Sequence, residues 1–217
     1  MVFKRRRKRS YGEIATEIVY PRGGWFRAVS YMFHRLRRLP DPPHKTARGI
    51  AAGVFVCFTP LFGLHFLAAA ALTFVMQGNM LAAMMATFFG NPLTFPIIAT
   101  LSYELGSWML GMHGGLSLPD IVASFSTASV ELWGNFTAMF TEETAHWNRL
   151  DRFFDHVFVP YLVGGLIPGV IVAVTAYTIS LPIISAYQKA RIKRLKKRFE
   201  KKRAAVNARA DAGEKLN

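Results

Sequence analysis

One uninterrupted stretch of this sequence, residues 49–148, contains no lysine or arginine, although the chain holds 27 basic residues and a formal net charge of +14. The basic residues fall in two terminal segments, 4–48 and 189–215, with only Arg149 and Arg152 elsewhere. A charged side chain is costly in the hydrocarbon core of a bilayer, and basic residues beside a span favour the cytoplasm. The distribution therefore predicts a multi-pass, all-α integral membrane protein with both termini cytoplasmic.

The partners predicted from this charge are the lipid bilayer and anionic lipid headgroups. In a soluble fold a net charge of this size would suggest nucleic acid. Here the basic residues flank apolar sequence, and each juxtamembrane Lys or Arg contributes roughly 1 kcal/mol of attraction to an anionic surface. We expect nucleic acid to be the poorer fit. The residues proposed to face lipid are Arg27, Arg37, Arg38, Lys189, Arg191, Lys193 and Arg194.

Composition divides the chain into five segments. Residues 1–48 form a basic tail, and its stretch 25–39 has an apolar arc at helical spacing that suits an interfacial helix or packing on the membrane domain. Residues 49–111 form a broken-helix core, and 112–156 form a polar or amphipathic connection. Residues 157–188 are a transmembrane helix, followed by the basic tail 189–217.

Two apolar segments carry helix-breaking residues. The segment 49–76 is interrupted by Thr59-Pro60 and Gly63, which predicts either a kinked span or two half-helices. The segment 80–111 is broken at Asn91-Pro92 and again at Pro96. About 20 apolar residues suffice to cross a bilayer, so each segment is long enough to be considered as a span.

The two basic tails require an even number of complete crossings. Two topologies meet this condition. In the first, which we prefer, 49–76 and 157–188 cross and 80–111 is re-entrant. In the second there are four crossings, and 121–140 is the weak one because Glu131 would lie in its middle. Arg149 and Arg152 lie outside in both.

The ordered motifs of the two broken segments resemble a bacterial family. The first is Gly49-x3-Gly53-x-Phe55 followed by Pro60-x2-Gly63, and the second is Asn91-Pro92-Leu93-Thr94-x-Pro96. Together they are similar to the domain of unknown function number 2062 over roughly residues 35–190. The family pattern often has Gln-Thr where this chain has Leu64-His65. The resemblance implies a small bacterial inner-membrane protein, and it brings no activity or catalytic residue with it.

The breaks are the candidate ligand site. A break inside the membrane frees backbone groups that only protein or a wet cavity can satisfy, and paired broken helices are typical of transporter sites. In the alternative interpretation, the polar side chains only cap helix ends. The candidate residues are Thr59, Pro60, Gly63, His65, Asn91, Pro92, Thr94 and Glu104.

His65 and Glu104 could relay a proton, or His65 could bond a carbonyl freed at Pro60 while Glu104 reaches the interface. Gly49 and Gly53 have the small-xxx-small spacing that lets helices approach closely. No cofactor and no metal site is predicted, because Asp151/Asp155 and the histidines match no metal motif and a solvated helix paired with Arg149 and Arg152 accounts for them better. No catalytic residue is assigned.

Three functions follow from these observations. The preferred one is a transporter-like or lipid-handling protein with a polar site at the helix breaks. The alternative is a non-catalytic membrane scaffold or envelope-associated protein that recruits partners or anionic lipid through its basic tails. A lipid-modifying enzyme with Glu104 or His65 as the acid or base is the weakest, since it lacks a second carboxylate or a nucleophile.

Overall fold

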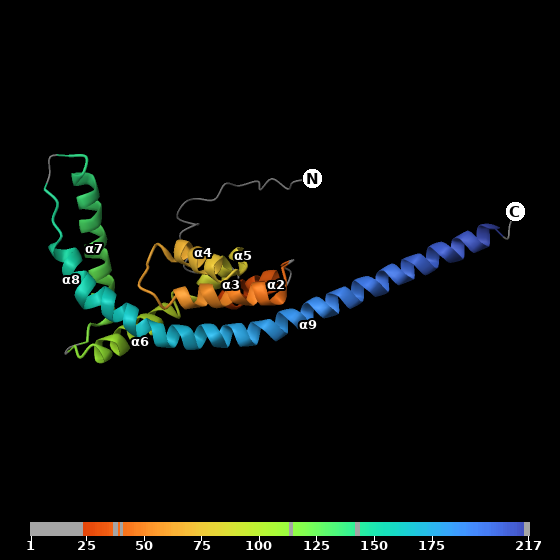
Figure 1. Ribbon diagram of the computed structural model, residues 1–217, viewed down its shortest axis with the longest axis horizontal. Coiled ribbons are helices and arrows are strands. Elements are labelled where there is room, and N and C mark those ends of the chain that lie inside the picture. The colour runs from red at the N-terminus through yellow and green to blue at the C-terminus, as the bar shows by residue number, and fades with distance from the viewer. Residues whose placement is uncertain (1–23, 37–38, 40, 113–114, 142–143, 215–217) are drawn as a thin grey trace.

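The computed structural model describes residues 24–36, 39, 41–112, 115–141 and 144–214, and every element in this part is helical (Figure 1). The all-α expectation is confirmed there. Arg37 and Arg38 lie outside the described residues. The elements are α2 (Gly24–Leu36), α3 (Pro43–Val56), α4 (His65–Val75), α5 (Met80–Ala86), the 3-10 helix η1 (Thr87–Phe89), α6 (Phe95–Met109), α7 (Leu118–Ala138), α8 (Asn148–Phe153), the π-helix η2 (Phe154–Phe158) and α9 (Val159–Glu214).

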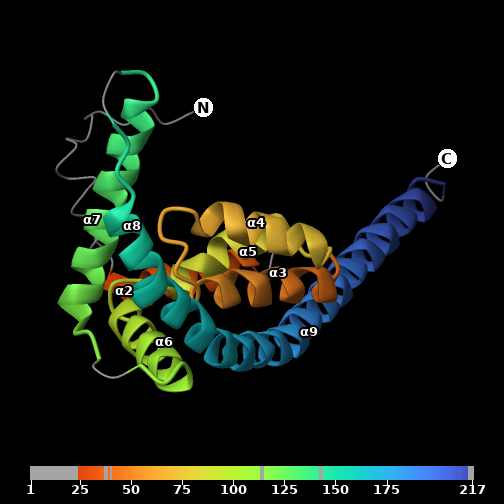
Figure 2. The same cartoon turned by 60° about the vertical axis from the view of Figure 1, so that its left-hand side comes forward.

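The C-terminal helix organises the molecule. Within the described part, one helical stretch, Asn148–Lys201, is long and apolar enough to cross a membrane by length and composition. Its α9 portion curves along the body and then projects beyond it (Figures 1 and 2). Pro168 and Pro182 lie inside α9, where each removes one backbone hydrogen bond and favours bending.

The first broken segment turns back on itself. The Asn79 backbone N–H, at the start of α5, donates to the carbonyl of Lys45 in the first turn of α3 over 2.8 Å. The far end of α4 therefore returns to the beginning of α3, and the two helices are antiparallel neighbours (Figure 2). The single kinked span across 49–76 is wrong, and the alternative of two half-helices is correct.

Two short helices, α3 and α6, pack along successive parts of α9. The side-chain amide of Gln188 donates to the Asp41 carbonyl just before α3 over 2.9 Å, while the end of α3 meets Gly165. Between Gly165 and the start of α9, α6 packs on α9 in place of α3, and its Gly106 contacts Pro160. Both α3 and α6 thus run antiparallel to α9, and together they cover the stretch that precedes its basic extension.

The two ends of this body are closed by α2 and α7. Leu36 and Leu39 are buried against Ala82 of α5, so α2 packs on the protein's own core, which was the alternative to an interfacial position. At the other end, α7 begins with a capping box between Ser117 and Asp120 and lies across the direction of α9 (Figure 1).

Candidate functional site

The first helix break lies between α3 and α4. The Thr59 hydroxyl donates to the carbonyl of Val56 over 2.7 Å, which satisfies one of the acceptors left free at the end of α3. Gly63 has a φ of 81°, a left-handed conformation that glycine adopts without a steric cost. The His65 ring is directed at the backbone of Thr59. The polar groups of this break are therefore turned toward its own backbone.

The second break is closed by Asn91 and Thr94. The Asn91 side-chain oxygen accepts from the backbone N–H of Leu93 at 2.8 Å and of Thr94 at 3.2 Å. The Thr94 hydroxyl donates to the carbonyl of Phe89 and accepts from the Asn91 backbone N–H at 3.1 Å. Asn91 thus acts as the N-cap of the turn that leads into α6. The geometry favours the interpretation that both side chains cap helix ends.

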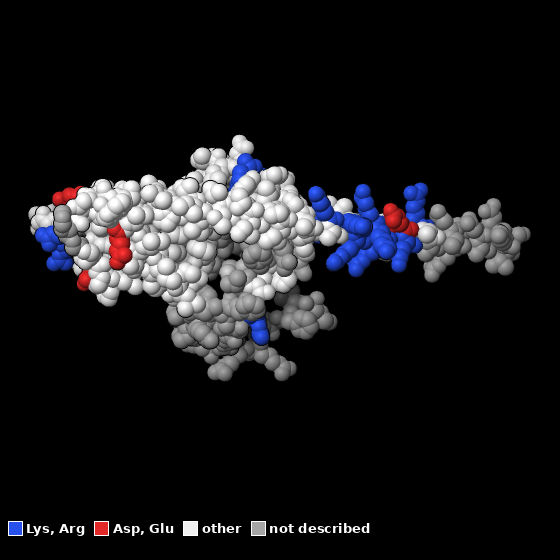
Figure 3. All heavy atoms as spheres, turned by 90° about the horizontal axis from the view of Figure 1, so that it is seen from below, with Lys and Arg blue, Asp and Glu red and all other residues white. Residues whose placement is uncertain are grey.

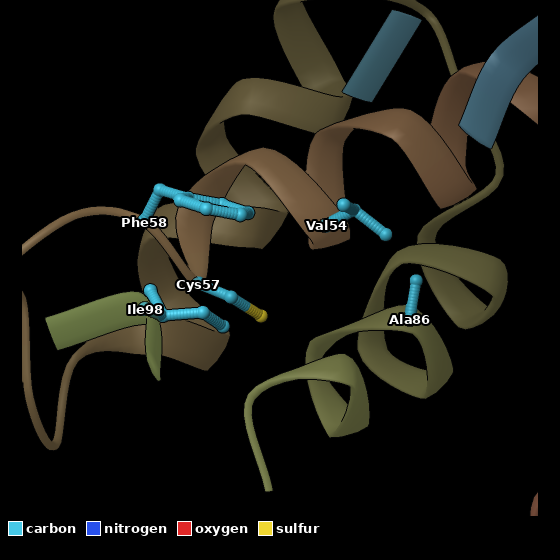
Figure 4. Packing of buried hydrophobic residues seen from close by; sticks show 5 residues of the cluster. All are labelled: Val54, Cys57, Phe58, Ala86 and Ile98. Atoms are coloured by element: carbon cyan, nitrogen blue, oxygen red, sulfur yellow. The ribbon is translucent and has the colours of Figure 1, made fainter. Parts of the chain in front are cut away.

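The two breaks lie against each other. The Cys57 thiol is within 3.3 Å of the carbonyl of Thr87, and the Phe58 and Phe89 rings stack at 6.2 Å. Across the next turn the Phe62 and Phe95 rings meet edge to face at 5.1 Å. Figure 4 shows how Val54, Cys57, Phe58, Ala86 and Ile98 close the space between the breaks with buried apolar side chains.

Two buried hydroxyl groups remain near this junction. Ser102 and Tyr161 are 0% exposed, and neither hydroxyl has a hydrogen-bond partner among the described residues. The Tyr161 ring packs against Phe62 and Phe125 at centroid distances of 5.8 and 6.4 Å. A polar site at the breaks would have these two hydroxyls as its available groups, because Asn91 and Thr94 are already engaged.

Glycines set how closely the helices approach. A Cβ on Gly49 would lie 2.3 Å from the Asn79 carbonyl oxygen, and a Cβ on Gly53 would lie 2.3 Å from that of Ala83. Both glycines therefore face α5 within the chain. On α9, a Cβ on Gly165 would lie 2.0 Å from the carbonyl oxygen of Phe58 at the first break.

Glu104 and His65 are not joined in this arrangement. Glu104 is exposed on α6, and in the described part of the chain no hydrogen bond or ion pair involves its carboxylate. The His65 ring instead contacts Phe62 at 5.4 Å. A proton relay between Glu104 and His65 has no support from this geometry.

The segment between α7 and α9 is held by two polar side chains of α7, Glu131 and Asn135. Glu131 accepts from the backbone N–H groups of Arg149 and Leu150 and so caps α8. Asn135 is buried and pairs with both backbone groups of His146, at 2.6 and 2.9 Å. In α7 the carboxylate that would burden a span thus stabilises a helix start instead.

Arg149 and Arg152 line a hollow with His156 at this end of the molecule. Among the described residues, the only ion pair is that of Lys45 with Asp41, so the expected pairing of Asp151 and Asp155 with these arginines is not seen there. The described residues contain no group of three His, Cys, Asp or Glu side chains that could hold a metal ion.

A groove of about 440 Å³ lies between α3, α4 and α9. Its wall is apolar except at one end, where Arg48 and Tyr177 stand. Sequence reasoning missed this groove, because it forms only when α4 folds back along α3. The lining residues are Arg48, Ala51, Ala52, Phe55, Leu72, Met76, Val170, Ala173, Val174 and Tyr177.

The basic residues of α9 lie outside this body. Lys189, Arg191, Lys193 and Arg194 are all exposed on the part of the helix that projects from the core. Figure 3 shows their charge gathered there, with a nearly uncharged surface between this extension and the opposite end of the molecule. Arg27 is exposed on α2.

Comparison with known proteins gives one match. A family described as an uncharacterised protein conserved in bacteria (DUF2062) matches residues 26–193, which is most of the chain. No curated protein and no solved structure matches.

Proposed function

This chain belongs to the DUF2062 family of uncharacterised bacterial proteins, and we propose that it is a lipid-handling protein of the bacterial inner membrane. It binds a lipid chain in the groove between α3, α4 and α9. The observation that carries this proposal is the groove itself, which is walled by apolar side chains and has a single cationic group, Arg48, at its end.

The helix lengths support two complete crossings. At 14 and 11 residues, α3 and α4 are about 21 and 16 Å long, too short for a hydrocarbon core of about 30 Å. They enter the membrane and leave it on the same side. The first crossing is made by α5 and α6 on either side of the second break, and the other by α9. The number of crossings is two, as in the topology preferred from the sequence. The roles of the segments are reversed, because 49–76 is now re-entrant and 80–111 crosses.

This topology puts both basic tails on the cytoplasmic side, in agreement with their charge. It also puts the first break inside the membrane, beside the early part of α9, where the Phe58 carbonyl meets Gly165. Unpaired backbone groups are tolerated there only when protein satisfies them. The caps at Thr59 and Asn91 meet that need, which is why we place the ligand in the groove and not at the breaks.

The chemistry of the groove matches an acyl chain. Ligand sites commonly have volumes of about 300–1,000 Å³ and mostly apolar walls, and this groove lies within that range. Small side chains at Ala51, Ala52 and Ala173 make room along its floor. An extended chain lying there would reach from Phe55 toward Arg48.

Two neighbouring positions on α9 provide a matched test. Val170 lines the groove, whereas Ile171 is 60% exposed and is not among the lining residues. In Val170→Trp the indole would occupy the groove, and we expect the lipid retained by the purified protein, counted by native mass spectrometry, to fall several-fold. Ile171→Trp should retain lipid as the unchanged protein does. Equal retention in both variants would contradict the proposal.

A second candidate, a scaffold that recruits anionic lipid or partners, is favoured by the exposed cationic extension of α9. The scaffold hypothesis makes the opposite prediction for the lipid retained by Val170→Trp. Under the scaffold hypothesis Val170→Trp has no effect, while removal of residues 200–217 lowers the attachment of the protein to anionic vesicles.

A further inference from the structure

Arg48 is the last basic residue before the stretch 49–148, which contains no lysine or arginine, and it lies at the end of the groove. Its Nε atom is buried and has no hydrogen-bond partner among the described residues. A buried donor of a charged group is costly when it is left without an acceptor. The position therefore calls for an anionic acceptor.

The protein supplies no such acceptor from the groove walls. The sequences of α3 and α4 contain no aspartate or glutamate, and α9 contains none before Glu200. The nearby Asp41 is already engaged, because its carboxylate pairs with Lys45 at 3.8 Å and accepts from the Asn79 side chain. Among the described residues around the groove, no free carboxylate is therefore available to Arg48, and a bound molecule can supply the anion.

The neighbours of Arg48 further limit the kind of headgroup. Tyr177 lines the same end of the groove, and its hydroxyl lies 3.5 Å from His44 Nδ1. These groups can donate to phosphate oxygens, and an arginine fork fits phosphate in a bidentate manner. A zwitterionic lipid would also bring an ammonium group to a site whose free charges are basic.

We infer that Arg48 binds the phosphate of an anionic phospholipid whose acyl chain lies in the groove. This inference rests on the proposed lipid-binding function and adds the headgroup to it. The guanidinium contacts the phosphate at the cytoplasmic surface, and the chain extends past Ala51 and Ala52 toward Phe55.

The test uses the full-length protein in detergent with phosphatidylglycerol and phosphatidylethanolamine of identical chains. Both lipids present a phosphate, but phosphatidylethanolamine adds an ammonium group that the basic end of the groove repels, so native mass spectrometry should show that the unchanged protein binds phosphatidylglycerol several-fold more tightly. Arg48→Gln should weaken the binding of both lipids, because both present a phosphate, and should lose the preference for phosphatidylglycerol. Arg152→Gln, which removes an exposed charge of α8 away from the groove, should keep the preference.

The outcomes separate the two proposals. If Val170→Trp reduces the binding of both lipids while Arg48→Gln leaves the preference intact, the groove stands and the role of Arg48 is overturned. If Val170→Trp changes nothing, both are overturned. A preference lost equally in Arg152→Gln would identify a general effect of the protein's charge and overturn the site at Arg48.

A measurement on the unchanged protein guards against a misfolded variant. A ligand that binds only the folded state raises its thermal stability. Phosphatidylglycerol should raise the melting temperature more than phosphatidylethanolamine at the same concentration. Equal melting temperatures would overturn the inference without any substitution.

Discussion

Five glycines place their Cα atoms against backbone carbonyl oxygens of neighbouring helices: Gly49, Gly53, Gly106, Gly164 and Gly165. Helices in lipid gain little from the hydrophobic effect, so close van der Waals contact and weak Cα–H···O bonds matter more for their association. The spacing of Gly49 and Gly53 was readable from the sequence. The contact of Gly106 with Pro160 was not, because nothing local indicates which distant helix a lone glycine faces.

Gly165→Ala should destabilise the protein by about 1–3 kcal/mol, as overpacking does, since the new Cβ would lie 2.0 Å from the Phe58 carbonyl. Gly134→Ala is the matched control. Gly134 lies within α7 with no atom near its ideal Cβ, so alanine there should stabilise by about 0.5–1 kcal/mol. Thermal unfolding of the two purified variants measures both changes. Equal melting temperatures would refute the tight contact at Gly165.

At the scale of elements, the sequence predicts where the helices break but not where they go afterwards. Pro60 and Pro92 mark both breaks, because proline cannot continue the hydrogen-bond ladder. The return of α4 along α3 depends on contacts between positions far apart, such as Asn79 with Lys45. The groove follows from that return, so sequence reasoning placed the ligand at the polar residues of the breaks instead.

Asn91→Ala should lower the stability by about 1 kcal/mol, the usual cost of a lost N-cap, and should leave lipid binding unchanged. Asn91→Asp retains a side-chain oxygen and should restore part of the stability. Thermal unfolding together with lipid counting distinguishes the roles. If Asn91→Ala lowered the amount of bound lipid without lowering the stability, the ligand site would lie at the second break and not in the groove.

At the scale of the whole molecule, the charge distribution is consistent with the topology that we propose. The uncharged surface in Figure 3 separates the cationic extension of α9 from the end that carries α7 and α8. From the sequence, the two basic tails set only a parity condition, and two topologies with both tails in the cytoplasm met it. The topology that we propose differs from the four-crossing alternative at α3 and α4, because each helix is too short to span the bilayer alone.

Gln77 distinguishes the proposed topology from the one preferred on sequence alone. If 49–76 crossed the membrane, Gln77 would lie outside. If α3 and α4 form a re-entrant pair, Gln77 lies in the cytoplasm, two residues before Asn79, which bonds the Lys45 carbonyl. In a Cys57→Ala background, Gln77→Cys should therefore resist a membrane-impermeant maleimide added to intact spheroplasts and react once they are lysed. Thr144→Cys, in the exposed segment before α8, should react in intact spheroplasts. Labelling of both positions from outside would make 49–76 a true crossing and disprove the re-entrant pair.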